Sequence, residues 1–223
     1  MRKSEWLQGG PFLEVSFLLE LKEENKETIQ EIIMKLSKVR SKIEIYDKNV
    51  GDMMDLFDRG YPYDEEDPQT TYMHSLQLRV YVCLSRERRA TLQIERVSSN
   101  AVMVNFWFYG SIFDTSEWGQ IGIKKEEMQD FSNFLKELYA EYEFKVGCMA
   151  IEQDVLELFG LDETYPNECY RYENMVPERF LPESSHFINI IWNEKYEKLS
   201  DVPYKHTRLE KGGILIRIGS FNE

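Results

Sequence analysis

Apolar and polar residues alternate near the start of the chain. Over residues 13–21, Leu, Val and Phe occupy every second position, and the positions between them are Glu14, Ser16, Leu18 and Glu20. A period of two residues is typical of a β-strand that buries one face. The pattern therefore predicts a first strand over this segment, with Glu14 on the face opposite the apolar one.

Two longer segments have the apolar spacing of amphipathic helices. In the first, apolar residues recur at helical intervals from Ile29 to Ile43, and basic residues occupy much of the other face. In the second, the same spacing runs from Met128 to Tyr142. Both intervals correspond to the helical repeat. We expect one helix from Thr28 to Ile43 and another over 128–142.

Three segments in the middle of the chain alternate again, and short turns separate them. They are Leu78–Leu84, a segment that contains Leu92 and Ile94, and Val102–Phe108. Short turns connect antiparallel neighbours, whereas parallel strands need long crossovers. The pattern predicts a meander of antiparallel strands. Compact apolar runs predict later strands, at Lys145–Ile151, Phe187–Trp192 and Gly213–Ile218.

The segments between these elements have weaker patterns. Residues 110–122 predict an ordered loop, and a short helix is expected from about Gln153 to Gly160, a residue that suits a helix end. Residues 161–185 contain three prolines and predict an irregular surface segment. Residues 193–211 form a polar insertion.

The order of these elements predicts an α+β fold, with amphipathic helices packed on one face of a mainly antiparallel sheet. We interpret residues 1–223 as a single domain. A division into a core over 1–160 and an irregular C-terminal extension with added strands over 161–223 stays open.

The composition is that of a folded protein with an acidic surface. Apolar residues make up 42% of the 223 residues and aromatic residues 13%, which argues against intrinsic disorder. The formal net charge of -13 repels phosphate backbones and anionic lipid headgroups. We therefore expect neither nucleic acid nor a membrane as a partner.

The cysteines and the N-terminus indicate a compartment. Cys83, Cys148 and Cys169 are odd in number and lack CxxC spacing, so they predict reduced thiols. Glu14 and Glu20 interrupt the apolar run near the N-terminus, which argues against a signal peptide. No uncharged stretch approaches the ~20 residues that a membrane helix needs. We expect a cytoplasmic protein.

An acidic segment over residues 44–67 is the most distinctive feature of the chain. It holds nine carboxylates, and its basic residues are Lys48 and Arg59. Aspartate recurs at every third position from 52 to 58 with apolar residues between, which predicts a short helix with three carboxylates on one side. Because like charges repel, this clustering favours a functional explanation; a solvated loop is the alternative. The candidate partner-binding residues are Asp52, Asp55, Asp58, Tyr61, Tyr63, Asp64, Glu65, Glu66, Asp67 and Trp118.

The sequence lacks the usual catalytic signatures. His74, His186 and His206 do not have HxH or HExxH spacing, and no GxSxG, GxxxxGK[ST] or GxGxxG pattern occurs. We therefore predict no metal and no cofactor. The alternative function is a hydrolase with a carboxylate or divalent-metal site on loops at one end of the sheet. Its candidate residues are Asp114, Glu117, Glu152 and Asp154.

A family resemblance lies in the middle of the chain. A strand that ends at Tyr109-Gly110 precedes a loop with the sequence Trp118-Gly119-Gln120-Ile121-Gly122, and a helix and a strand through Gly147 follow. In a small acidic α+β body, this arrangement, over roughly residues 78–152, resembles bacterial toxin-immunity proteins. The resemblance implies a cytosolic protein that binds and blocks a cognate toxin. It assigns a role to no residue.

These observations favour a non-enzymatic protein that neutralises or regulates a basic protein partner. Clustered carboxylates with tyrosines beside them suit a positively charged surface, such as the cleft of a nuclease toxin. Beside the hydrolase, a third hypothesis is a homo-oligomer whose exposed aromatic residues pair the subunits. The sequence leaves the oligomeric state open.

Overall fold

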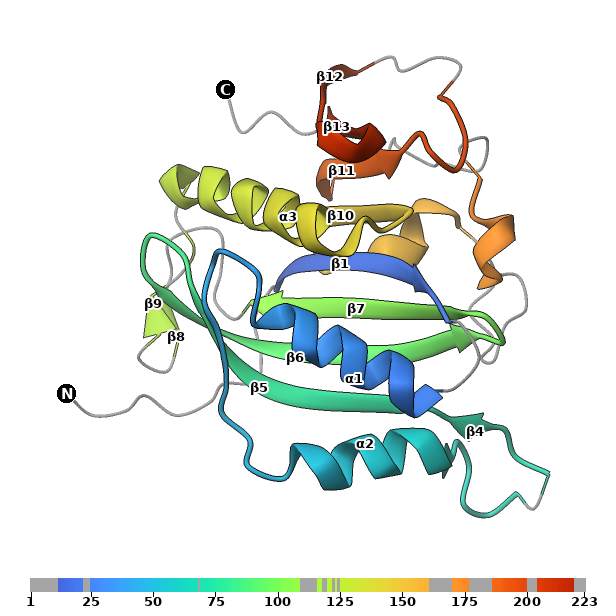
Figure 1. The fold of residues 1–223 in the computed structure, drawn as a ribbon. Coiled ribbons are helices and arrows are strands. Elements are labelled where there is room, and N and C mark those ends of the chain that lie inside the picture. The colour runs from blue at the N-terminus through green and yellow to red at the C-terminus, as the bar shows by residue number, and fades with distance from the viewer. Residues whose placement is uncertain are drawn as a thin grey trace.

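One large antiparallel sheet organises the computed structural model, which describes residues 12–21, 25–67, 69–108, 116–117, 120–121, 123, 125–160, 170–176, 186–199 and 204–218. The strands of this sheet are β1 (Leu13–Glu20), β2 (Ile43–Ile45), β5 (Ser75–Cys83), β6 (Glu87–Ser98), β7 (Ala101–Phe108), β10 (Val146–Ile151), β11 (Phe187–Asn193), β12 (Lys205–Arg208) and β13 (Gly213–Arg217). Their order across the sheet is β12-β13-β11-β10-β1-β7-β6-β5-β2 (Figure 1). β1 therefore lies in the middle, between β7 and β10.

The α-helices of the described residues cover one face of this sheet. They are α1 (Asn25–Leu36), α2 (Val50–Arg59) and α3 (Met128–Tyr142). In Figure 1, α1 and α3 lie in front of the sheet, and α2 lies along its lower border. Apolar side chains of each helix share one buried cluster with Val15 and Phe17 of β1. The helices thus bury the apolar stripes that their sequences predict.

The opposite face of the sheet is covered as well. The short 3-10 helices η2 (Val155–Leu158) and η4 (Tyr172–Asn174) contribute to a second buried cluster there. Leu18 and Cys148, from the central strands, belong to this second cluster. The middle of the sheet is therefore enclosed on both sides, with the α-helices on one side and these 3-10 helices on the other.

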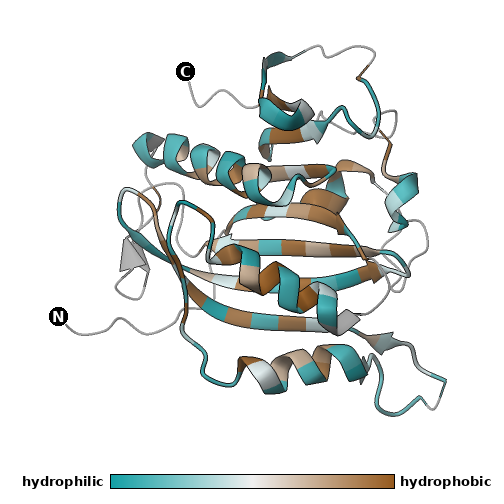
Figure 2. Cartoon of the chain, in the orientation of Figure 1, coloured by the Kyte–Doolittle hydropathy of each residue, from teal (hydrophilic) through white to brown (hydrophobic). Residues whose placement is uncertain are grey.

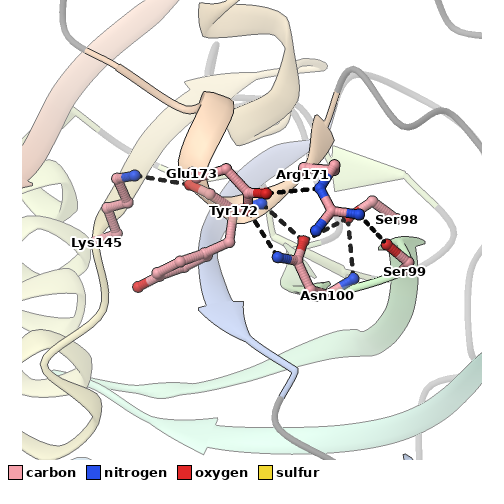
Figure 3. Close-up of polar contacts among 7 residues, drawn as sticks. All are labelled: Ser98, Ser99, Asn100, Lys145, Arg171, Tyr172 and Glu173. Atoms are coloured by element: carbon pink, nitrogen blue, oxygen red, sulfur yellow. Dashed lines mark hydrogen bonds and ion pairs between the residues drawn. The ribbon is translucent and has the colours of Figure 1, made fainter.

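Polar contacts hold η4 against the turn between β6 and β7 (Figure 3). The Asn100 side-chain amide donates to Glu173 at 2.7 Å, and its oxygen accepts from the Tyr172 N–H at 3.0 Å. Lys145 directly precedes β10, and its ammonium donates to the Tyr172 carbonyl at 2.7 Å. Burial lowers the pKa of Lys145, so this hydrogen bond partly compensates a desolvated charge.

The predicted fold class is confirmed. The second predicted helix coincides with α3, and the predicted aspartate-rich helix coincides with α2. The late strands β11 and β13 extend the same sheet as β1. In Figure 2 the strands in the middle of the sheet are mainly brown, which reflects their apolar composition.

The prediction that β1 buries only one face is wrong. Glu14 is only 9% exposed, and the strand is buried on both sides from Leu13 to Leu18. The cause is its central position, because β7 and β10 flank the strand and the second cluster covers the face that we expected to be polar. Leu18, an apolar residue on that face, is consistent with this arrangement.

The prediction that the first helix continues to Ile43 is also wrong. α1 ends at Leu36, after which the Val39 N–H bonds to the Leu36 carbonyl in a turn. Val39 is nevertheless buried, so it prolongs the apolar spacing beyond the helix. Ile43 begins β2 instead, where it lies opposite Val82 on β5.

Several short elements were not predicted. β12 lies within the predicted polar insertion, and a small pair of strands lies within the predicted loop over 110–122. The described helices contain none that is both long and apolar enough to span a membrane. The remaining short elements are β3 (Tyr61–Pro62), β4 (Tyr72–Met73), β8 (Ser116–Glu117), β9 (Gln120–Ile121), η1 (Lys125–Glu127) and η6 (Glu210–Gly212).

Candidate interaction surface

The α2 helix separates apolar from acidic side chains. Phe57 is fully buried, and Val50, Met53 and Met54 pack beside it against the main cluster. The helical repeat then places the aspartates on the opposite side, where all of them are exposed. These exposed residues are Asp52, Asp55 and Asp58.

A histidine and a glycine fix the end of α2 against the sheet. The His74 ring Nδ1 lies 2.8 Å from the Phe57 carbonyl oxygen, and the two rings are in contact. Gly60, with a φ of 73°, ends the helix by donating its N–H to the Leu56 carbonyl at 2.8 Å. A Cβ at Gly60 would lie 2.9 Å from the His74 ring. The acidic helix is therefore attached firmly at its C-terminal end.

A short hairpin continues from α2 and carries more acidic residues at its tip. β3 and β4 form this hairpin, in which Tyr61 lies opposite Met73 and Pro62 opposite Tyr72. At the tip, the Asp64 and Asp67 side chains accept backbone N–H bonds at 2.9 Å, so they shape the turn. All four residues of the run Asp64–Asp67 are exposed. In Figure 1 the hairpin extends from the end of α2, along the same border of the molecule.

Exposed tyrosines gather on the same segment. Tyr63 is 74% exposed and Tyr61 38% exposed. Large apolar groups exposed together favour an interaction surface, since solvent-exposed aromatic rings bring apolar area to an interface. Five of the seven large apolar side chains exposed in the described part of the chain lie between residues 46 and 72; the seven are Met34, Tyr46, Leu56, Tyr61, Tyr63, Tyr72 and Tyr196.

Two carboxylates of the acidic segment are compensated by cations from outside it. Glu44 forms an ion pair with Lys42, and Asp47 forms one with Arg79 of β5. Burial favours a higher pKa for Asp47, but the hydrogen bonds and charge of Arg79 outweigh it and lower that pKa. We expected only Lys48 and Arg59 to compensate the charges of the acidic segment. This expectation is wrong for the first two carboxylates, Glu44 and Asp47.

The carboxylates of α2 and of the hairpin tip differ from this first part. Among the described residues, no ion pair involves Asp52, Asp58 or any residue of Asp64–Asp67. These side chains, together with Tyr61 and Tyr63, make up the α2–hairpin surface. It retains most of the candidate residues predicted from the sequence. Trp118, the remaining candidate, lies outside the described residues.

The alternative carboxylate site is only partly described. Asp114 lies outside the described residues, and only the backbone of Glu117 is described, in β8. Asp154 caps η2, where its carboxylate accepts the Leu156 N–H at 2.7 Å. A cavity of about 150 Å³ beside α1 and a groove of about 600 Å³ beside α3 are lined by other residues. Neither of these hollows unites the candidate carboxylates.

Glu14 is a titratable residue that the sequence did not single out. Burial raises its pKa to about 7, and the nearby charges of Asp154 and Glu152 act in the same direction. A hydrogen bond of 2.6 Å from the Asn105 amide partly offsets the shift. The structure thus places one buried carboxyl group near two members of the alternative site. The sequence contained one sign of this burial. Leu18 is apolar and occupies the same alternating positions of the strand as Glu14.

In the part of the chain that the structure describes, no group of three or more His, Cys, Asp or Glu side chains is arranged to hold a metal ion. Comparisons of this chain with protein-family models, with curated proteins and with solved structures find no match.

Proposed function

We propose that this protein is a non-enzymatic binding protein that docks a basic protein partner on its α2–hairpin surface and thereby neutralises or regulates it. The observation that carries the proposal is the combination of exposed carboxylates with exposed tyrosines on one attached segment. Six of these carboxylates form no ion pair with a described residue. The carboxylates supply attraction and orientation, and the tyrosines supply contact area.

The folding of the segment supports a binding role over a merely solvated one. α2 is anchored by Phe57 and His74, and the hairpin tip is ordered by its own side chains. A preorganised array of charges loses less conformational entropy on binding than a flexible loop does. Because like charges destabilise one another at close range, their concentration on ordered elements supports the proposal of a cationic partner.

A narrower form of the proposal concerns the partner's identity. Many intracellular toxins are nucleases, whose clefts must be positive to hold phosphates. An ordered row of carboxylates is able to occupy such a cleft as a phosphate mimic. On this reading the protein acts as the immunity partner of a toxin, as its resemblance to toxin-immunity proteins implies.

Partner capture at different salt concentrations tests the proposal. The tagged protein is incubated with an extract of its source cell at about 0.05 M and about 0.5 M salt, and bound proteins are identified. We expect a basic protein that is retained at low salt and released at high salt. The triple variant Asp52→Lys, Asp55→Lys and Asp58→Lys should weaken retention at least about tenfold.

A matched variant separates the surface from the net charge. Glu87, Glu126 and Glu210 are exposed acidic residues on other elements, and their replacement by lysine changes the net charge equally. This control should retain the partner nearly as well as the wild-type protein. Equal loss in both triple variants, or capture that does not depend on salt, would contradict docking on the α2–hairpin surface.

A further inference from the structure

One guanidinium group is already bound in the acidic segment, just before α2, and its contacts indicate which cations suit this segment. Arg79 donates from Nε to an Asp47 oxygen at 2.9 Å, and its guanidinium carbon lies 4.9 Å from the centre of the Tyr46 ring. Tyr46 and Asp47 are consecutive in the sequence. A carboxylate and an aromatic face thus bind the same cation, by a charge-assisted hydrogen bond and by a cation–π contact.

The hairpin repeats this pair of residues without a bound cation. Tyr63 and Asp64 are consecutive, and no described cation lies over the Tyr63 ring. The Asp64 Oδ1 atom accepts the Glu66 N–H, and its second oxygen makes no hydrogen bond to a described residue. Tyr61 lies two residues before Tyr63, at the start of β3, and both side chains are exposed.

We propose that the partner is recognised through arginine side chains, which stack on Tyr61 and Tyr63 while they bond to the neighbouring carboxylates. This inference rests on the proposed function and specifies the partner as a protein with an arginine-rich segment. Guanidinium is planar and weakly hydrated, so it binds a ring and a carboxylate at once. Lysine is a compact, strongly hydrated charge that matches this arrangement less well.

Isothermal titration calorimetry with two synthetic peptides tests the inference. The peptides have equal length and charge, with glycine alternating with arginine in one and with lysine in the other. We expect the arginine peptide to bind the full chain about threefold to tenfold more tightly at physiological salt. The double variant Tyr61→Leu and Tyr63→Leu should lose this preference but keep the salt-dependent binding of both peptides.

The control is Tyr196→Leu, which removes a tyrosine that is 48% exposed between β11 and β12, far from β2 in the sheet order. It should keep the preference for arginine. Thermal unfolding verifies that each variant is folded, and the single variant Tyr63→Leu gives the same comparison if the double variant is not.

The outcomes separate the inference from the proposed function. Equal affinity for both peptides, or an arginine preference that survives in the tyrosine variants, would overturn arginine recognition while a basic partner stays supported. Failure of both peptides to bind, even at low salt, would contradict the basic partner and arginine recognition together.

Discussion

Glu14 is a carboxyl group that the fold encloses between two strands and beneath a second apolar cluster. Its pKa rises from an ordinary value of 4.5 to about 7, chiefly because burial disfavours the charged form. The unfolded chain therefore loses this proton at a lower pH than the folded chain does. Between these two pKa values, the folded state binds more protons, so its stability falls as the pH rises.

We expect Glu14→Gln to flatten the dependence of stability on pH. In the wild-type protein, the favourable contribution of protonated Glu14 is complete below pH 4.5 and is lost as the pH rises through about 7. The variant should be more stable than the wild type at pH 8, on the order of 2 kcal/mol, and about equal to it at pH 4.5. Urea unfolding across this range measures the difference.

Glu20, exposed at the end of the same strand, supplies the control for that measurement. Glu20→Gln removes a carboxyl group that is not buried, and it should not reproduce the gain in stability that Glu14→Gln shows at pH 8. A Glu14→Gln profile parallel to that of the wild type would show that Glu14 does not titrate in this range.

Side-chain contacts between residues that are far apart in the sequence could not be predicted from it. Asp47 and Arg79 are 32 positions apart, and Glu14 and Asn105 are 91 positions apart. A sequence pattern describes neighbours along the chain, so it identified the acidic positions but not their partners or their burial. The exposed carboxylates of α2 were predictable because their exposure follows from the helical repeat alone.

At the scale of elements, His74 couples α2 to the sheet. We expect His74→Ala to remove the contact with the Phe57 carbonyl and to cost about 1 kcal/mol of stability. Amide hydrogen exchange should quicken in α2 more than in the central strands, because the helix would open locally. His206→Ala removes an exposed histidine on β12 and should leave α2 unchanged. Uniform acceleration in α2 and β1 would contradict a local role for His74.

The packing between β10 and the helical face leaves no room at Gly147. A Cβ there would lie 2.7 Å from the Phe144 ring and 2.9 Å from the Phe17 Cβ. We expect Gly147→Ala to destabilise the fold by about 1–3 kcal/mol, through overpacking. Gly51→Ala is the matched control, since nothing lies within 4 Å of its added Cβ, and it should stabilise α2 by about 0.5–1 kcal/mol. Thermal unfolding of both variants measures the contrast.

The length of an element determined whether its hydrophobic pattern could be recognised in the sequence. α3, with 15 residues, repeats its apolar stripe several times, and so it was predicted with its observed bounds. β2 has three residues and β12 has four, which is too short to establish a period. Ile43, the first residue of β2, also continues the helical spacing of the segment before it. Its position therefore fitted a helix as well as a strand. The hairpin strands β3 and β4 were missed for the same reason.

At the scale of the molecule, charge is distributed unevenly across the sheet. The acidic α2–hairpin surface adjoins the side that ends in β2, whereas β12 at the opposite edge exposes Lys205 and Arg208. Such an asymmetry orients an approaching basic protein before contact, and salt screens it. The salt dependence expected for partner capture therefore arises from the electrostatic field of the whole molecule as well as from individual carboxylates.

The two edges of the sheet are formed by β2 and β12, which are short strands with charged residues. Directly inside β13 lies β11, which is apolar in most positions and buried throughout. A premature stop codon ahead of residue 204 would remove β12 and β13 and leave β11 as an unprotected template for pairing between chains. Such a shortened product should accumulate in inclusion bodies, whatever the state of its binding surface.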